Sequence, residues 1–172
     1  MKYTEHFDLV MKAMTGSGVL IGTYDAEGNP NIMTAGWGSI GYSWGVPLWN
    51  ILVRPSRFTY EALEHNGCFT INVPDKSLAF AMGLCGSKSG RDVNKFELCN
   101  LTAKKAGNVL APIVEECPIV YECQVVHSND ILPEKLIEEI LNGSYFEGDF
   151  HRQYFGKILA AYAVEDAVKL LK

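Results

Sequence analysis

The sequence of 172 residues lacks the long apolar runs and the basic excess that mark several classes of protein. No apolar run approaches the length of a membrane span. The N-terminal MKYTEHFDLV has acidic residues where a signal peptide needs an uninterrupted apolar segment. Acidic residues outnumber basic ones by 20 to 15, so the net charge of −5 gives no attraction to nucleic acid or to an anionic membrane. These absences predict a cytoplasmic protein with no nucleic-acid partner and no membrane partner.

Cysteine and histidine are few, and neither residue type is spaced for metal or disulfide chemistry. The five cysteines form no CxxC pair and are odd in number, which argues against a disulfide framework; they are Cys68, Cys85, Cys99, Cys117 and Cys123. The four histidines are too scattered for a local zinc motif. No Ser/His/Asp arrangement and no acidic pair stand out. The sequence therefore predicts buried free thiols, no metal site and no catalytic side chain.

What the sequence does contain is the pattern of one globular domain over residues 1–172, with 48% apolar and 20% charged residues. Short β-branched and aromatic runs between turn formers predict strands over residues 19–24, 31–37, 48–53, 68–73, 113–126 and 153–164. Helical patterns occupy the two chain ends, residues 58–66, the first part of 76–96, and 132–141 with an apolar face. Because strands outnumber helices and do not alternate with them, we predict a mainly β protein, an antiparallel sheet or barrel with peripheral helices.

Three glycines, Gly36, Gly38 and Gly41, spell GxGxxG, the spacing of a dinucleotide-binding turn. That motif requires a helix directly after the glycines. The segment from Tyr42 to Pro47 is a poor helix former by propensity and by the position of its proline. The glycines instead predict a bulged strand where a backbone comes close to a flat partner.

Four motifs, in this order, resemble the flavin reductase-like, FMN-binding split-barrel family that includes flavoredoxin. They are YDAEGNPNIMTAGW, RPSRFTYEALEHNGCFTINV, SGRDVNKFE and HRQYFGKI, and the resemblance runs from about Val19 to about Val164. It implies an antiparallel Greek-key split β-barrel, FMN bound non-covalently at the rim, and a homodimer. Residues 131–149 are longer than the usual connection, which predicts a helical insertion over or beside the site.

The RPSRFT stretch has the chemistry of an anion site. A helix N-terminus offers free backbone N–H groups, Ser56 and Thr59 offer hydroxyls, and Arg54 and Arg57 offer charge-assisted bonds. The residues alone leave a second interpretation open, in which Ser56 caps the helix and both arginines are solvated. The resemblance favours the FMN phosphate as the ligand and adds Lys95 of GRDVNKF. Neither Thr59 nor Lys95 is assigned to the core.

The NIMTAGW stretch is where the resemblance places the flavin ring. It implies that Asn31 and the following backbone lie along the polar edge of the ring; the backbone residues are Met33, Thr34, Ala35 and Gly36. Trp37 is expected beside the ring, with core packing as the alternative. For Trp44, which matches no family motif, we expect core packing. His151 aligns with a family histidine near the cofactor, with a polar residue at a strand edge as the alternative.

The resemblance implies an FMN-dependent oxidoreductase in which hydride or electrons pass through the flavin. Two activities fit it: an NAD(P)H-dependent flavin reductase, and a flavoredoxin-type electron-transfer protein. NAD(P)H, free flavin and a redox partner protein are the corresponding reaction partners. A flavin- or haem-derivative-binding module without turnover of its own is the alternative from another class.

Overall fold

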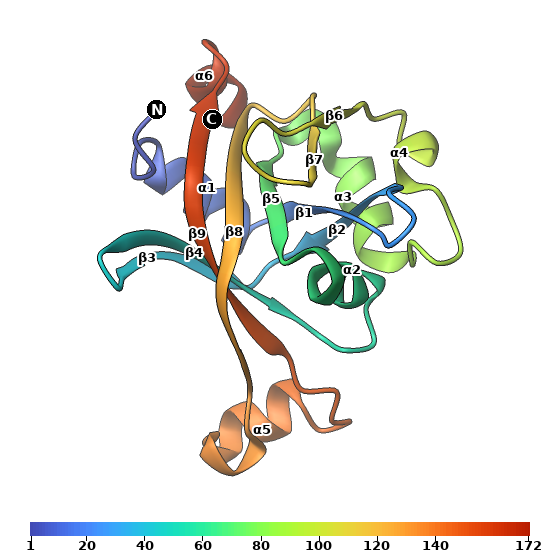
Figure 1. The fold of residues 1–172 in the computed structure, drawn as a ribbon, viewed down its shortest axis with the longest axis vertical. Helices are drawn as coiled ribbons and strands as arrows, with labels where there is room; N and C mark the ends of the chain where they lie inside the picture. Colours follow the sequence, from blue (N-terminus) through green and yellow to red (C-terminus); the bar gives the residue numbers. More distant parts are fainter.

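The centre of the protein is an antiparallel sheet of seven strands (Figure 1). The computed structural model describes all 172 residues. The strands of the sheet are β1 (Val19–Tyr24), β2 (Pro30–Ala35), β3 (Gly38–Ser43), β4 (Val46–Val53), β5 (Cys68–Val73), β8 (Ile119–Asp130) and β9 (Arg152–Ala163). Their order is β2-β1-β5-β8-β9-β4-β3, so the edge strands β2 and β3 do not pair with each other and the sheet is not closed. The predicted antiparallel fold class is confirmed.

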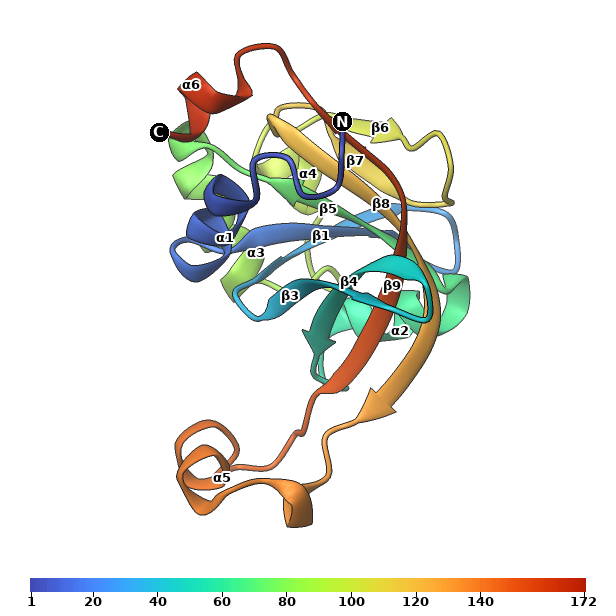
Figure 2. The same ribbon diagram turned by 90° about the vertical axis from the view of Figure 1, so that its left-hand side faces the viewer.

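The helices lie around this sheet. They are α1 (Phe7–Thr15), α2 (Phe58–Asn66), α3 (Ala79–Ser87), α4 (Lys95–Leu98), α5 (Glu138–Ser144) and α6 (Ala167–Leu171). Two short strands, β6 (Ala103–Lys105) and β7 (Pro112–Val114), form a separate hairpin. Both views place α5 away from the rest, beyond the end of the β8–β9 hairpin (Figures 1 and 2). No helix has both the length and the apolar character needed to cross a membrane.

The turns follow from residue types that were recognised in the sequence. Between β1 and β2 the Asp25 carboxylate accepts the backbone N–H groups of Glu27 (3.0 Å) and Asn29 (2.7 Å), and Gly28 has a φ of 84°. Helix α2 ends at Gly67, whose φ of 62° continues neither helix nor strand. Both predictions are confirmed.

The glycine-rich segment forms no bulged strand, so that prediction is wrong. Strand β2 ends at Ala35, and β3 begins at Gly38 and turns back to β4 through Trp44 (φ 55°) and Gly45 (φ 75°). A Cβ on Gly38 would lie 2.6 Å from the carbonyl oxygen of Asn50. The glycine therefore permits the approach of β4 and not of a flat ligand. As a half-exposed edge strand, β3 lacks the apolar alternation that would have revealed it.

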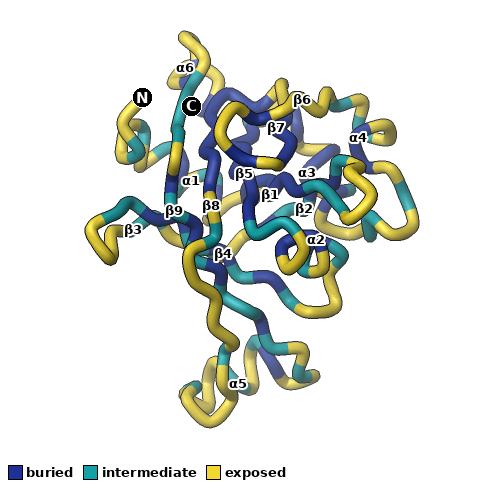
Figure 3. Tube along the Cα trace, viewed as in Figure 1, coloured by how far each residue is buried: buried dark blue, intermediate teal, exposed yellow.

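The core follows the central strands, which Figure 3 shows as the buried part of the chain. Trp49 and Tyr121 are fully buried, with ring centroids 4.7 Å apart. The predicted free thiols are confirmed: all five cysteines are unpaired, and four are buried while Cys99 is half-buried.

The predicted insertion at 131–149 contains a helix, but the predicted bounds of 132–141 are wrong. A 3-10 turn covers Pro133–Lys135, the next two residues are extended, and α5 begins only at Glu138. The apolar side chains of Ile137 and Ile140 are 65% and 43% exposed, so no core covers the expected apolar face. A helix of this length draws most of its stability from packing, and here there is little to pack against.

The buried carboxylate of Glu122 generates a prediction about stability. It accepts the backbone N–H groups of Gly107 (3.1 Å) and Asn108 (2.5 Å) and the hydroxyl of Tyr162 (3.0 Å). Burial raises the pKa of Glu122, but these bonds together outweigh it and lower the pKa overall. Glu122→Gln should therefore lower the free energy of unfolding at pH 7 by about 1–3 kcal/mol, since charged hydrogen bonds are lost.

Urea unfolding at a series of pH values tests this. Because the folded-state pKa is the lower one, the Glu122 contribution is complete above the unfolded pKa of about 4.3 and is lost as pH falls through the folded pKa. The two proteins should therefore converge at acid pH. Glu115→Gln, at an exposed ion pair with Lys104, is the control and should change little. A constant difference at all pH values would contradict the assignment.

Candidate functional site

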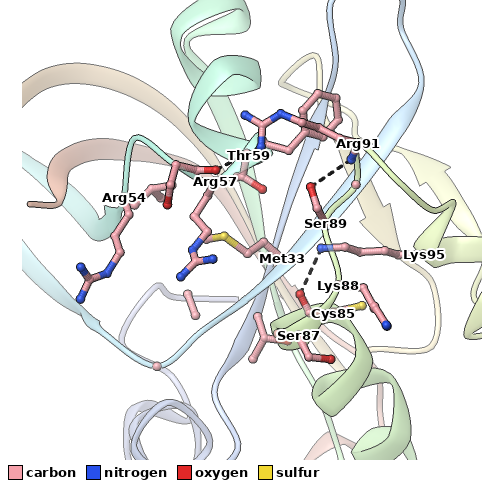
Figure 4. Close-up of a pocket in the computed structure, with 18 of the residues that line it drawn as sticks. Met33, Arg54, Arg57, Thr59, Cys85, Ser87, Lys88, Ser89, Arg91 and Lys95 are labelled. Carbon is pink, nitrogen blue, oxygen red and sulfur yellow. Dashed lines mark hydrogen bonds between the residues drawn. The ribbon is translucent and has the colours of Figure 1, made fainter. Parts of the chain in front are cut away.

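A cavity of about 610 Å³ lies at the open edge of the sheet, between strands that are not neighbours. Its walls are the end of β2 with Gly36 and Trp37, the end of β4, the loop 54–57 with the start of α2, and the end of α3 with the loop 88–92 (Figure 4). All the predicted site residues except Asn31 line it: Met33, Thr34, Ala35, Gly36, Trp37, Arg54, Ser56, Arg57, Thr59, Lys95 and His151. Segments far apart in the chain thus meet at one cavity.

The β2 wall offers backbone groups and an indole. Because β2 pairs only with β1, alternate backbone N–H and C=O groups on its outer edge have no strand partner. Trp37 lies two residues after the end of β2 and is 47% exposed. The centroids of its ring and of the His151 ring are 5.0 Å apart. Core packing is therefore wrong for Trp37. It is also wrong for Trp44, which occupies a hairpin turn and is 65% exposed.

Arg54 and Ser56 line the cavity, and both bond to the end of the 131–149 insertion. The Arg54 guanidinium donates to the carbonyls of Ser144 (2.9 Å), Gly148 (3.2 Å) and Asp149 (2.9 Å), which uses three of its five N–H groups. The Ser56 backbone N–H (3.3 Å) and hydroxyl (2.6 Å) donate to the Asp149 carboxylate. The interpretation of a solvated arginine and a serine cap is therefore wrong for these two residues, since Ser56 does not cap α2.

Asn31 and Thr59 form a buried pair behind the cavity wall. The Asn31 amide donates to the hydroxyls of Thr59 (2.9 Å) and Thr23 (3.2 Å). A Cβ on Gly90 would lie 2.3 Å from Asn31 Oδ1, so the loop after α3 can pass over Asn31 only because position 90 is glycine. Asn31 thus supports the wall and does not line this cavity. Thr59 is 2% exposed, yet its own hydroxyl proton has no partner within the protein and can be donated into the cavity.

Lys95 is a buried part of the wall, contrary to the prediction that it lies outside the core. Its ammonium donates to the carbonyls of Ile32 (2.8 Å) and Cys85 (3.1 Å), and the residue is 5% exposed. Burial lowers the pKa of Lys95. Two of its three N–H donors join the free edge of β2 to the last turn of α3, which leaves one donor for a ligand.

The loop 88–92 brings residues to which the sequence analysis gave no role, and from Ser89 onward they belong to the SGRDVNKFE motif. Arg91 donates to the carbonyl of Ser56 (3.1 Å), pairs with Glu61, and lies over the ring of Phe58. Lys88 and Arg57 also line the cavity, and neither has an ion-pair partner within the protein. In Figure 4 the Arg57 side chain extends toward Met33. The signal for this loop was its run of glycine, serine and basic residues directly after a helix.

His151 is buried beside the aromatic end of the cavity, so the interpretation as a polar strand-edge residue is wrong. It is 9% exposed, and its Nδ1 lies 2.8 Å from the hydroxyl oxygen of Tyr145. Burial, assisted by the cation of Arg54, lowers the pKa of His151 to about 4. The imidazole is therefore neutral at neutral pH.

The sequence profile described as Flavin reductase like domain matches residues 11–171. The chain belongs to this family. The structure is similar to that of the flavoredoxin of Desulfovibrio vulgaris (Miyazaki F). The two superimpose with a TM-score of 0.70 at 29% identity, and the match covers 86% of this chain and 69% of that one. These findings confirm the predicted family and the predicted split-barrel fold class.

Two further proteins are similar to this chain. The FMN-binding protein from Thermus thermophilus has a TM-score of 0.66 at 22% identity, covering 84% of this chain and 68% of that one, a likeness of fold alone. The uncharacterized protein YddH of Escherichia coli (strain K12) is 35% identical over 102 residues, 59% of this chain and 53% of its own length. The chain thus spans about half the length of this curated relative.

The cavity of this flavin reductase like domain has two chemically distinct kinds of lining. Cations and hydroxyls, from Arg57, Thr59, Lys88 and Lys95, suit an anion. The free edge of β2 and the aromatic side chains around His151 suit a flat ring with polar edges.

Proposed function

We propose that this protein is an FMN-dependent oxidoreductase, acting as a flavin reductase or as a flavoredoxin-type electron carrier. The observation that supports this most is the lining of the cavity, which combines cations and hydroxyls with an unpaired strand edge and Trp37. Its volume of about 610 Å³ is in the range of small-molecule sites. Membership in the flavin reductase like family supports the same conclusion.

The phosphate is assigned to the cationic side chains of the lining. Arg57 and Lys88 have unpaired charges, Thr59 has a free hydroxyl proton, and Lys95 has one unused N–H. Arg54 and Ser56 support this site indirectly, because they fix the loop from which Arg57 extends. A dianion suits this donor set better than a neutral group does.

The ring is assigned to the β2 wall of the cavity. The backbone from Met33 to Gly36 offers donors and acceptors on a rigid strand, and Trp37 offers an apolar surface. When bound, FMN supplies hydride or electron transfer, and the protein supplies binding, orientation and electrostatics. The electron donor is NAD(P)H in the reductase and a redox protein in the carrier.

Spectroscopy of the purified protein tests the function. We expect FMN to bind with a visible flavin spectrum and to be bleached and recoloured reversibly. Under anaerobic conditions, rapid bleaching by NADH or NADPH identifies a reductase, whereas bleaching by dithionite alone indicates a carrier or the alternative of a binding module without turnover. Failure to bind flavin contradicts the proposal.

Replacing Arg57 tests the phosphate assignment. Arg57→Gln should lower FMN affinity by about 10- to 100-fold, because one charge-assisted bond contributes about 1.5–3 kcal/mol. Riboflavin, which has no phosphate, should bind as before. Titration by flavin fluorescence measures both. Lys105→Gln, an exposed lysine on β6, is the matched control and should change neither affinity. An equal loss for FMN and riboflavin would remove Arg57 from the phosphate site.

A homodimer belongs to the same proposal. Tyr42 and Trp44 at the β3–β4 turn are 64% and 65% exposed, and Val126 of β8 is 47% exposed. In the insertion, Ile137 and Phe146 are 65% and 78% exposed. Exposed aromatic and aliphatic groups of this kind are typical of surfaces that a partner covers. A second copy of this chain would cover both the surface at the β3–β4 turn and the insertion.

Light scattering tests the dimer. We expect a mass twice that of the 19.0 kDa chain. Trp44→Glu should shift the protein toward monomer, since a charge would be buried at the interface. Leu110→Glu, which adds a charge at another exposed apolar site (58%), is the control and should leave the mass unchanged. A wild-type protein that is monomeric with FMN bound would contradict the proposal.

A further inference from the structure

We infer that Tyr145, supplied by the 131–149 insertion, is a positioning residue that fixes His151 as its Nε2–H tautomer and so presents one neutral donor to the cavity. The donor itself follows from contacts within this chain. What the donor meets rests on the proposed function: a ring edge with an acceptor atom, as a flavin has.

The ring of Tyr145 is fixed on two sides. It stacks on Phe150 at 4.9 Å with an interplanar angle of 20°, and the Arg54 guanidinium lies 5.2 Å from its centroid. Arg54 in turn donates to the backbone carbonyls of Ser144, Gly148 and Asp149 on either side of Tyr145. Tyr145 is 6% exposed. Its hydroxyl therefore has one well-defined position, 2.8 Å from Nδ1 of His151.

The direction of this hydrogen bond follows from counting protons. The Tyr145 hydroxyl has one proton, and Nδ1 of His151 is its only acceptor within the protein. If Nδ1 carried the proton instead, the buried phenolic O–H would have no acceptor, which costs the desolvation of that group. Burial raises the pKa of Tyr145, and outweighs the lowering by Arg54 and by the His151 backbone N–H, so the phenol stays protonated.

The second nitrogen of His151 then carries the remaining proton. Nε2 has no hydrogen-bond partner within the protein. It is not one of the fully buried polar atoms that lack a partner, and His151 lines the cavity. The charged groups around the ring are Arg54, Arg57 and Asp149. Since two of these three are cations and the ring is buried, the imidazole remains neutral. The cavity thus receives an N–H donor without a charge.

The test of the tautomer uses the protein without flavin. In protein labelled with 15N-histidine, the His151 resonances, identified by their loss in His151→Gln, should show a protonated Nε2 and an unprotonated Nδ1 at neutral pH. This measurement needs no folded Tyr145 variant. A protonated Nδ1 would overturn the inference.

Tyr145→Phe then tests the origin of the tautomer. Only the neutral imidazole can accept the Tyr145 hydrogen bond at Nδ1, so this bond stabilises the neutral form. Removing it should therefore raise the pKa of His151 in an NMR titration. If Nδ1–H were instead the donor, the same variant would lower that pKa, which would overturn the inference, as would no change. Tyr42→Phe is the matched control, because the Tyr42 hydroxyl donates to Gly45 away from the cavity.

Flavin titrations test what the donor meets. His151→Ala should weaken FMN and riboflavin equally, by about two- to tenfold for one neutral hydrogen bond. His151→Gln, whose amide can replace the Nε2–H, should restore most of that affinity. Unchanged affinity in His151→Ala would overturn the assigned contact. If neither ligand binds even the wild type, the proposed function fails while the NMR result on Tyr145 stands.

Discussion

An edge strand leaves every second backbone N–H and C=O without a strand partner, and the site depends on how this protein treats that edge in β2. Part of the edge is covered: Lys95 donates to the carbonyl of Ile32, and Thr34 donates its hydroxyl to the carbonyl of Met82 in α3. These bonds attach α3 and the loop after it to the sheet. The stretch of β2 that follows remains open, and it faces the cavity.

The insertion is attached to the same cavity from the opposite side. Arg54 and Ser56 bind its last residues, and Tyr145 places its hydroxyl against His151. A charge buried without partners is costly, so Arg54 can be half-buried here only because three carbonyls surround its guanidinium. The tip of the β8–β9 hairpin is thereby fixed relative to the start of α2, although the two are about 90 residues apart.

Local patterns in the sequence were sufficient for most of the sheet, whereas the family resemblance supplied most of the residues that line the cavity. Alternation, turn residues and the Asn66-Gly67 pair located the strands and the end of α2 because each depends on neighbours in the chain. Strand β3 was missed because an exposed edge strand lacks an apolar pattern. The break before α5 was missed because an apolar pattern does not reveal whether other parts of the protein cover it. The partners of Arg54, and the Ile32 carbonyl that Lys95 binds, could not be read locally, because they lie 63 to 95 residues away.

The contact between Ser56 and Asp149 has a consequence for how function is transferred between related sequences. In this protein a carboxylate from a distant connection occupies donors that the RPSRFT stretch, taken by itself, would offer to a phosphate. A relative with the same six residues and a shorter connection would leave those donors free. Identical motifs can therefore have different functions. The length of chain between β8 and β9 must be compared before the role of Arg54 or Ser56 is transferred from one protein to another.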